Sequence, residues 1–250
     1  PPLPSHFEGR EHLLDDLIPR LVSGQTMALS AEGLPGVGKT TMAVVLAYHK
    51  AVLSHFKDGV LWASLGPTGD PLRLLGEWAE GLGEDISDLV TVAERQRVVT
   101  RLLGQQRLLL VIDDAWDEHT AKALNCGGPS CVYLLTTRYK DIARRFAGAA
   151  HVVSVPELAE DPAFILLQKL APEACAVDPA AARTLTKAVG GLPLALELLG
   201  GFLTRPEHMA FADLSQQALQ ELTDPAARLA LASKRLGSSE GPVTLAQLQR

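Results

Sequence analysis

The segment from Gly33 to Thr41, Gly-Leu-Pro-Gly-Val-Gly-Lys-Thr-Thr, limits what this chain can fold into more than any other part of the sequence. Its spacing, G-x-x-x-x-G-K-[ST], is typical of a loop that wraps phosphate groups. An apolar run at residues 26–30 predicts a buried strand before the loop, and residues 41–53 predict a helix after it. The expected inward face of that helix consists of Met42, Val45, Leu46, His49 and Leu53.

A strand, a glycine loop and a helix in this order gather backbone N–H groups and the positive end of a helix around one anion. Gly36 and Gly38 allow the backbone to approach phosphate oxygens, because they have no Cβ to oppose the required torsions. Lys39 would reach the β- and γ-phosphates, and the Thr40 hydroxyl would bind Mg²⁺. The plainer interpretation is a glycine-rich turn before a surface helix. The strand and helix on either side favour the phosphate site.

A second motif ends in two carboxylates. Residues 108–112 are all apolar, as in a strand buried on both faces of a parallel sheet, and Asp113 and Asp114 follow directly. Open α/β sheets bind their ligands at the carboxyl ends of such strands. Asp113 is therefore expected to hold Mg²⁺, through water, and Asp114 to polarise an attacking water. The alternative is a pair of aspartates that cap the next turn. The phosphate loop upstream favours the metal site over this alternative.

A further strand is expected at residues 131–138, ending in Thr137 and Arg138. Both residues would emerge at the same edge as the two aspartates. Arg138 could contact a γ-phosphate and report its presence, a role that suits a forked cation. A surface salt bridge is the alternative role for this arginine.

Composition narrows the class of protein. The chain has 29 acidic and 23 basic residues, for a net charge of −6, which argues against direct nucleic-acid binding. No apolar run approaches the roughly 20 residues that span a bilayer. Its three cysteines, Cys126, Cys131 and Cys175, have no C-x-x-C spacing and indicate reduced thiols. We therefore expect a cytoplasmic protein that does not enter a membrane.

The chain divides by its hydrophobic pattern. We expect an α/β fold, a three-layer parallel sheet of the P-loop nucleoside triphosphatase type, over residues 1–155. Its N-terminal strap packs on the core or, alternatively, lies beside a bound base at Phe7 to Arg10. A small helical bundle follows at 156–236, with two helices expected within 211–236. Residues 237–250 resemble a linker toward a further domain, so we expect a piece of a larger protein.

Several motifs together resemble one family, the NB-ARC module of the signal-transduction ATPases with numerous domains (the STAND class). This class includes plant disease-resistance proteins, the apoptosome adaptor and bacterial regulators. The resemblance extends over roughly residues 5 to 203, and the last two motifs in this order are quite specific to the family. The matching segments are Phe7-Glu8-Gly9-Arg10-Glu11, residues 33–41, 109–116 (Leu-Leu-Val-Ile-Asp-Asp-Ala-Trp), Thr136-Thr137-Arg138 and 191–196 (Gly-Leu-Pro-Leu-Ala-Leu).

The resemblance implies roles for individual residues. Phe7 and Arg10 would line the adenine site, and Pro193 with Leu194 would contact the base from the helical part. Asp113 and Asp114 would form the acidic pair of the Walker B strand, and Arg138 would be the sensor arginine. The 136–138 strand would lie between the phosphate-loop strand and the Walker B strand. The residues expected to bind phosphates are Pro35, Gly36, Val37, Gly38, Lys39, Thr40 and Thr41.

The family resemblance implies a switch that binds ADP or ATP with Mg²⁺ and hydrolyses ATP slowly. Its implied partners are effector and sensor domains of the same full-length chain, and other copies of the protein in the ATP state. One departure is that the winged-helix domain with its Met-His-Asp-like motif is not found. Two other functions stay open: an AAA-like ATPase with true steady-state turnover, and an oligomerisation scaffold that ignores nucleotide.

Overall fold

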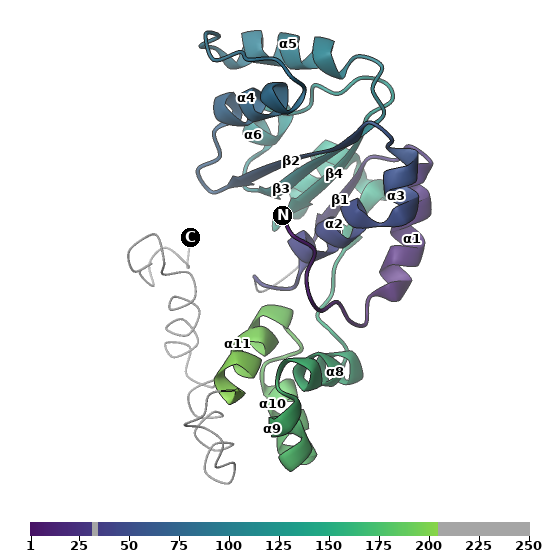
Figure 1. Cartoon of the computed structure of the whole chain (residues 1–250), viewed down its shortest axis with the longest axis vertical. Coiled ribbons are helices and arrows are strands. Elements are labelled where there is room, and N and C mark those ends of the chain that lie inside the picture. The colour runs from purple at the N-terminus through teal and green to yellow at the C-terminus, as the bar shows by residue number, and fades with distance from the viewer. Residues whose placement is uncertain (32–34, 205–250) are drawn as a thin grey trace. The chain divides into compact units, whose positions relative to one another are not determined.

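The computed structural model describes residues 1–31 and 35–204, which form two compact units (Figure 1). Of the described residues, 1–5 and 10–156 belong to the first unit, and 6–9 together with 157–204 belong to the second. Within the described residues, no helix combines the length and the apolar character needed to cross a membrane. The predicted helices within 211–236 and the predicted linker at 237–250 lie outside the described part of the chain.

The first unit is built on a parallel sheet of five strands in the order β2-β3-β4-β1-β5. The α/β fold predicted from the sequence is therefore confirmed. The Thr-Thr-Arg strand β4 lies between the phosphate-loop strand β1 and the acidic strand β3, as expected. The strands are β1 (Met27–Ser30), β2 (Gly59–Gly66), β3 (Leu108–Ala115), β4 (Val132–Thr137) and β5 (Val152–Ser154).

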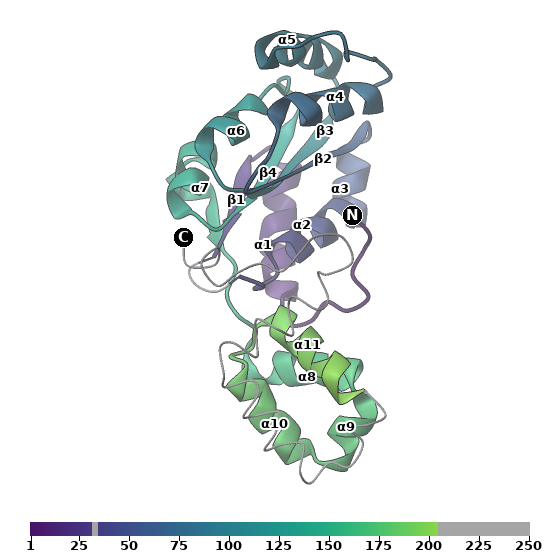
Figure 2. The same ribbon diagram turned by 90° about the vertical axis from the view of Figure 1, so that its left-hand side faces the viewer.

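Helices cover both faces of this sheet and complete three layers (Figures 1 and 2). Strand β3 is buried over Leu108–Asp113, because alternate side chains face opposite helical layers. Leu108, Leu110 and Ile112 share one core with the helices α4 to α7. The helices are α1 (Glu11–Val22), α2 (Lys39–Tyr48), α3 (Lys50–His55), α4 (Pro71–Gly81), α5 (Val92–Leu103), α6 (Glu118–Ala123), α7 (Lys140–Ala147) and the 3₁₀ turn η1 (Ala149–His151).

The structure corrects the single helix that the sequence predicted at residues 41–53. The chain forms two helices, α2 and α3, which meet at His49. His49 has an extended conformation (ψ 133°), and its Nδ1 accepts the N–H of Ala51 at 3.3 Å to cap α3. The change of direction leaves Leu53 exposed, whereas Met42 and Leu46 are buried as predicted. A local cap thus overrides a hydrophobic periodicity that continues past it.

The second unit is a bundle of short helices around an apolar core. Leu167, Leu185 and Leu196 are among the core residues contributed by three of these helices. Proline occupies the first helical position of the last three helices, where its missing N–H has no helical partner to lose. An ion pair between Lys169 and Glu8 ties residues 6–9 to this unit. The helices are α8 (Glu160–Leu170), α9 (Pro172–Val177), α10 (Pro179–Ala188) and α11 (Pro193–Leu203).

Candidate nucleotide-binding site

The phosphate loop lies where β1 ends and α2 begins. Because β1, β3 and β4 are parallel neighbours, their carboxyl ends bring the loop, the aspartate pair and Arg138 to one edge of the sheet. Gly36 and Gly38 have φ values of 91° and 93°, in the left-handed region that disfavours side chains. Gly38 is the N-cap of α2, whose first turn contains no acidic side chain. The free N–H groups of this helix end can therefore bind an anion.

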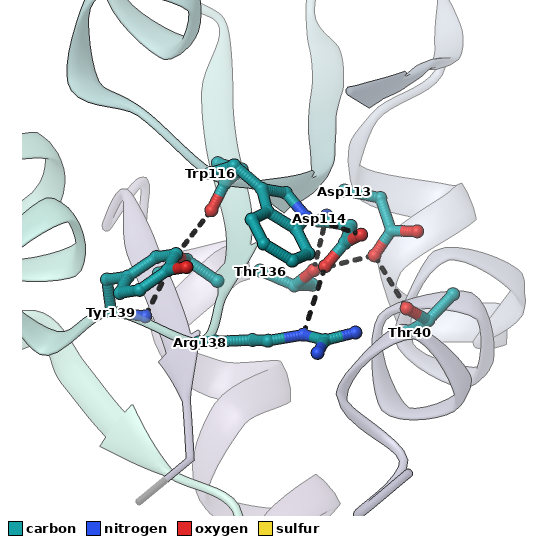
Figure 3. Close-up of polar contacts among 9 residues, drawn as sticks. Thr40, Asp113, Asp114, Trp116, Thr136, Arg138 and Tyr139 are labelled. Atoms are coloured by element: carbon teal, nitrogen blue, oxygen red, sulfur yellow. Dashed lines mark hydrogen bonds and ion pairs between the residues drawn. The ribbon is translucent and has the colours of Figure 1, made fainter. Parts of the chain in front are cut away.

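Asp113 joins two threonines of this site through one carboxylate oxygen (Figure 3). Its Oδ1 accepts a hydrogen bond from the Thr40 hydroxyl at 2.8 Å and another from the Thr136 hydroxyl at 2.6 Å. Burial raises the pKa of the Asp113 carboxyl, and the hydroxyls of Thr136 and Thr40 act in the opposite direction. The link from Thr40 to Asp113 joins the phosphate-loop helix directly to the acidic strand.

The oxygen donors at this point suit a magnesium ion. Mg²⁺ prefers hard oxygen ligands and commonly uses only one or two protein groups beside water and phosphate. The Thr40 hydroxyl and the Asp113 carboxylate lie within hydrogen-bond distance of each other at the helix end. Both residues predicted as metal ligands are therefore close enough to act on one ion, directly or through water.

Lys39 is the first residue of α2 and is only 9% exposed. Burial lowers the pKa of its ammonium group, and the positive charge of Arg138 lowers it further. The charges of Asp114 and Asp113 act in the opposite direction. An anionic phosphate at this point would be attracted by both cations and would stabilise the charged form of Lys39.

Asp114 has an unusual backbone conformation for a residue at the end of a strand. Its φ is 53°, the only positive φ at a residue other than glycine in the described part of the chain. The pairing of β3 with β4 is irregular between Ile112 and Ala115. Bulges of this kind redirect side chains and are common beside active sites. Here the carboxylates of Asp113 and Asp114 both point toward the side of Thr40 and Arg138 (Figure 3).

Arg138 lies beside Asp114, as the sequence predicted for that edge. Its Nε is 3.8 Å from Asp114 Oδ1. The Trp116 indole donates its N–H to Asp114 Oδ2 at 2.9 Å, and the Arg138 guanidinium carbon is 5.0 Å from the centre of the indole. Three side chains at the carboxyl ends of the neighbouring strands β3 and β4 therefore form one polar and aromatic group.

Two residues of this site were missed as functional residues in the sequence. Thr136 bonds Asp113 and also accepts the N–H of Asp114 at 2.9 Å. Trp116 was only part of a matching motif and had no assigned role. A polar residue near the end of a buried strand was the available signal for Thr136, since a buried hydroxyl needs a partner.

Arg10 is almost fully buried in the α/β unit, against the phosphate loop. Its guanidinium donates hydrogen bonds to the carbonyl oxygens of Val37, of Gly38 at 3.4 Å and of Pro156 at 3.0 Å. This arginine therefore ties the N-terminal segment to the back of the loop and to the end of the unit. Its predicted position beside a base stays a prediction.

The other predicted base contacts belong to the helical unit. Phe7 is half-buried in the short segment 6–9, Pro193 is the first residue of α11, and Leu194 is exposed beside it. Of the predicted phosphate-loop residues, Pro35 is exposed, Thr41 is half-buried and Val37 is buried. Gly33, the first residue of the motif, lies outside the described residues.

The glycine loop connects a central parallel strand to a helix. Asp113, at the end of the acidic strand, bonds Thr40, which follows the loop lysine. These features together define a P-loop nucleotide-binding module. The family model described as NB-ARC domain matches residues 10–176, about two thirds of the chain. The chain therefore belongs to the NB-ARC family, as its motifs predicted.

Two curated relatives support this assignment. The chain is 33% identical over 201 residues to "Regulatory protein AfsR" of Streptomyces griseus, which covers 77% of this chain and 20% of the relative. It is 26% identical over 256 residues to "Disease resistance protein RGA2" of Solanum bulbocastanum, covering 96% of this chain and 26% of the relative. The chain thus spans about a fifth to a quarter of the length of these proteins.

A solved structure supports the fold. A STAND protein with a tetratricopeptide repeat sensor from Pyrococcus horikoshii superposes with a TM-score of 0.55 at 18% identity. The match covers 89% of this chain and 33% of that one. At this level of identity the match concerns the fold, which agrees with the five-stranded sheet and its covering helices.

Proposed function

We propose that this module is an adenine-nucleotide switch of a larger signalling or regulatory protein, with slow hydrolysis of ATP. Its conformation would depend on whether ADP or ATP is bound, because the two nucleotides make different contacts with the same residues. Membership of the NB-ARC family supports nucleotide binding. The names of the relatives, a regulatory protein and a disease-resistance protein, support the wider role.

The observation that carries this proposal is the direct bond between Thr40 and Asp113, next to the pair formed by Arg138 and Asp114. The first contact would hold Mg²⁺ on the β- and γ-phosphates, which neutralises phosphate charge when the ion is bound. The second would offer a guanidinium to the γ-phosphate and a carboxylate to an attacking water.

Each residue of the site has one proposed task. Lys39 and the N–H groups of residues 35–41 bind phosphate oxygens. Arg138 offers its charge to the γ-phosphate, and Asp114 orients water and accepts its proton. Phe7, Arg10, Pro193 and Leu194 contact the base, for which Pro193→Ala gives a test. If the Pro193→Ala protein keeps the full preference for adenine over guanine, that part of the proposal is wrong.

The test begins with the nucleotide that the purified protein carries. We would denature the protein, separate the released nucleotide by chromatography, and then measure single-turnover and steady-state hydrolysis with Mg-ATP. Stoichiometric ADP with a slow single turnover supports the switch. Steady-state turnover near 1 s⁻¹ or above, about the low end for kinases, would favour an ATPase that turns over freely.

Asp114→Asn separates binding from hydrolysis. We expect this protein to bind Mg-ATP as tightly as the wild type and to lose hydrolysis, because an amide does not accept the proton of water. Hydrolysis at the wild-type rate would remove the proposed role of Asp114.

Lys39→Ala tests the alternative of an oligomerisation scaffold. If this variant assembles as the wild type does, with and without nucleotide, the scaffold would be supported instead.

The remaining elements of the proposal concern partners. We propose effector and sensor domains in the same full-length chain, self-association in the ATP state and a cytoplasmic location. The small share of each relative that this chain covers supports the first of these. Size measurement of the full-length protein with ADP and with a non-hydrolysable ATP analogue tests the second.

A further inference from the structure

Trp116 touches both residues on which the proposed hydrolysis depends. Its indole N–H donates to Asp114 Oδ2 at 2.9 Å, and its ring lies 5.0 Å from the guanidinium carbon of Arg138. Asp114 and Arg138 are themselves 3.8 Å apart at their nearest oxygen and nitrogen. Each of the three side chains therefore contacts the other two (Figure 3).

The group is partly exposed, so its geometry needs support. Asp114 and Arg138 side chains are 33% and 38% exposed, and an ion pair in such a setting is weak by itself. A hydrogen bond to a carboxylate and a cation over an indole each add to the ion pair. The ring of Tyr139 meets Trp116 edge to face at a centroid distance of 6.0 Å, which restrains the indole in turn.

The backbone at Asp114 gives a second reason for a dedicated partner. A residue at φ 53° is free of the extended geometry that fixes side-chain direction along a strand. The carboxylate therefore depends on its hydrogen bonds for its direction. The indole N–H supplies one of them and occupies the oxygen that does not face Arg138.

We propose that Trp116 is a positioning residue that holds Asp114 and Arg138 as one paired unit until a triphosphate binds. The γ-phosphate then competes with Asp114 for Arg138, and the guanidinium leaves both the carboxylate and the ring. Trp116 retains Asp114 in the direction that water requires. This inference rests on the proposed function, in which Arg138 contacts the γ-phosphate and Asp114 acts on water.

Tryptophan suits both demands at this position. The indole has a hydrogen-bond donor at its edge and the most favourable ring face for a cation. Phenylalanine keeps a ring for Arg138 and loses the donor for Asp114. Leucine loses both. The two substitutions therefore separate the two contacts.

The first experiment uses the fluorescence of Trp116. The other tryptophans are removed by Trp62→Phe and Trp78→Phe, and emission is recorded without nucleotide, with Mg-ADP and with Mg-ATPγS. We expect ATPγS to shift the emission and ADP to shift it less, because only the triphosphate draws Arg138 away from the ring. In an Arg138→Ala background the two nucleotides should give the same emission. An identical response to ADP and ATPγS in the protein with intact Arg138, with both bound, would overturn the proposal.

The second experiment compares Trp116→Phe and Trp116→Leu with the wild type. Trp116→Phe should slow single-turnover hydrolysis by about ten-fold to a hundred-fold, the size expected for one lost hydrogen bond to a charged group, with ADP affinity within about two-fold. Trp116→Leu should also raise the preference for ATPγS over ADP, because the ring no longer competes with the γ-phosphate for Arg138, and this rise should disappear in an Arg138→Ala background. Wild-type hydrolysis in Trp116→Phe, or an equal loss of ADP and ATPγS binding in both variants, would show a structural role only and overturn the inference.

Trp62→Phe is the matched control. Its indole N–H bonds Ser64 Oγ at 3.0 Å on the edge strand β2, so the same chemical change is made away from the site. It should alter neither hydrolysis nor the nucleotide preference.

If the wild type itself binds no triphosphate, the proposed function fails. The emission of Trp116 in the nucleotide-free protein then tests the paired unit. A shift in both Arg138→Ala and Asp114→Asn supports it, and the absence of a shift in one or both of these variants overturns it.

Discussion

The two units of this chain differ in whether they bury charged side chains. Every buried charged side chain in the described residues, Arg10, Lys39 and Asp113, belongs to the α/β unit. The helical unit has an apolar interior, in which Thr186 is buried but bonds its own helix at the Ala182 carbonyl. Its ion pairs, such as Arg183–Asp161 and Lys187–Glu160, lie at the surface.

This difference teaches where the chemistry of the molecule lies. Buried charges are costly unless they are paired or serve a ligand, and active sites collect them for this reason. The α/β unit buries Lys39 and Asp113 at one edge of its sheet, beside the positive φ of Asp114. In the helical unit, the described buried residues serve packing. Substitutions at the site of the α/β unit should therefore reduce nucleotide binding, whereas substitutions in the core of the helical unit should reduce stability.

The largest effect is expected from Lys39→Ala. Loss of one charged partner from a buried phosphate contact costs on the order of 3 to 5 kcal/mol, or a hundred-fold and more in affinity. Calorimetric titration with Mg-ATP measures this. Lys50→Ala, at an exposed position on α3, is the control and should bind normally. Unchanged affinity in Lys39→Ala would contradict the assignment of the loop.

A core change in the helical unit should reduce stability instead. Leu167 is fully buried in α8, and Leu167→Ala should lower the free energy of unfolding by about 2 to 5 kcal/mol. Ile165 lies on the same helix and is 42% exposed, so Ile165→Ala should cost well under half as much. Urea denaturation followed by circular dichroism compares the two. Equal losses would mean that α8 packs differently from its described position.

Two buried threonines give a direct comparison of the units. Thr136→Val removes a hydroxyl that serves Asp113 and the Asp114 N–H, so we expect a loss of about 1 to 3 kcal/mol in the free energy of unfolding. Thr186→Val removes only a bond to a carbonyl of its own helix and should cost about 0.5 kcal/mol or less. The same urea assay measures both. If Thr186→Val proves the more costly, the contrast between the units is wrong.

A last effect, absent near neutral pH, concerns a buried thiol. Burial raises the pKa of Cys126 in the α/β unit from 9.0 to about 12. The unfolded chain therefore releases this proton first, and the free energy of unfolding should fall as pH rises from about 9 toward 12. Cys126→Ala should show a flatter decline over this range. An identical slope in the variant and the wild type would remove Cys126 as a cause.

Much of the α/β unit follows from the pattern of the sequence. The sequence predicts the glycine loop, the apolar strand ending in Asp113 and Asp114, and the strand ending in Arg138. Parallel strands end at one edge, so these residues were expected together and are found together. The helix predicted at 41–53 was wrong because the His49 cap redirects the chain inside a continuous apolar period.

The sequence by itself determined the phosphate loop, the three strands that carry the site, the polar residues at their ends and the family, because these depend on local patterns and on a few spacings. Only the tertiary structure decided how the site is connected. Thr136 bonds Asp113 across 23 residues, and Trp116, directly after β3, contacts Arg138, directly after the neighbouring strand β4. Such contacts depend on the order and register of the strands and on the turned backbone at Asp114, and no local pattern records these.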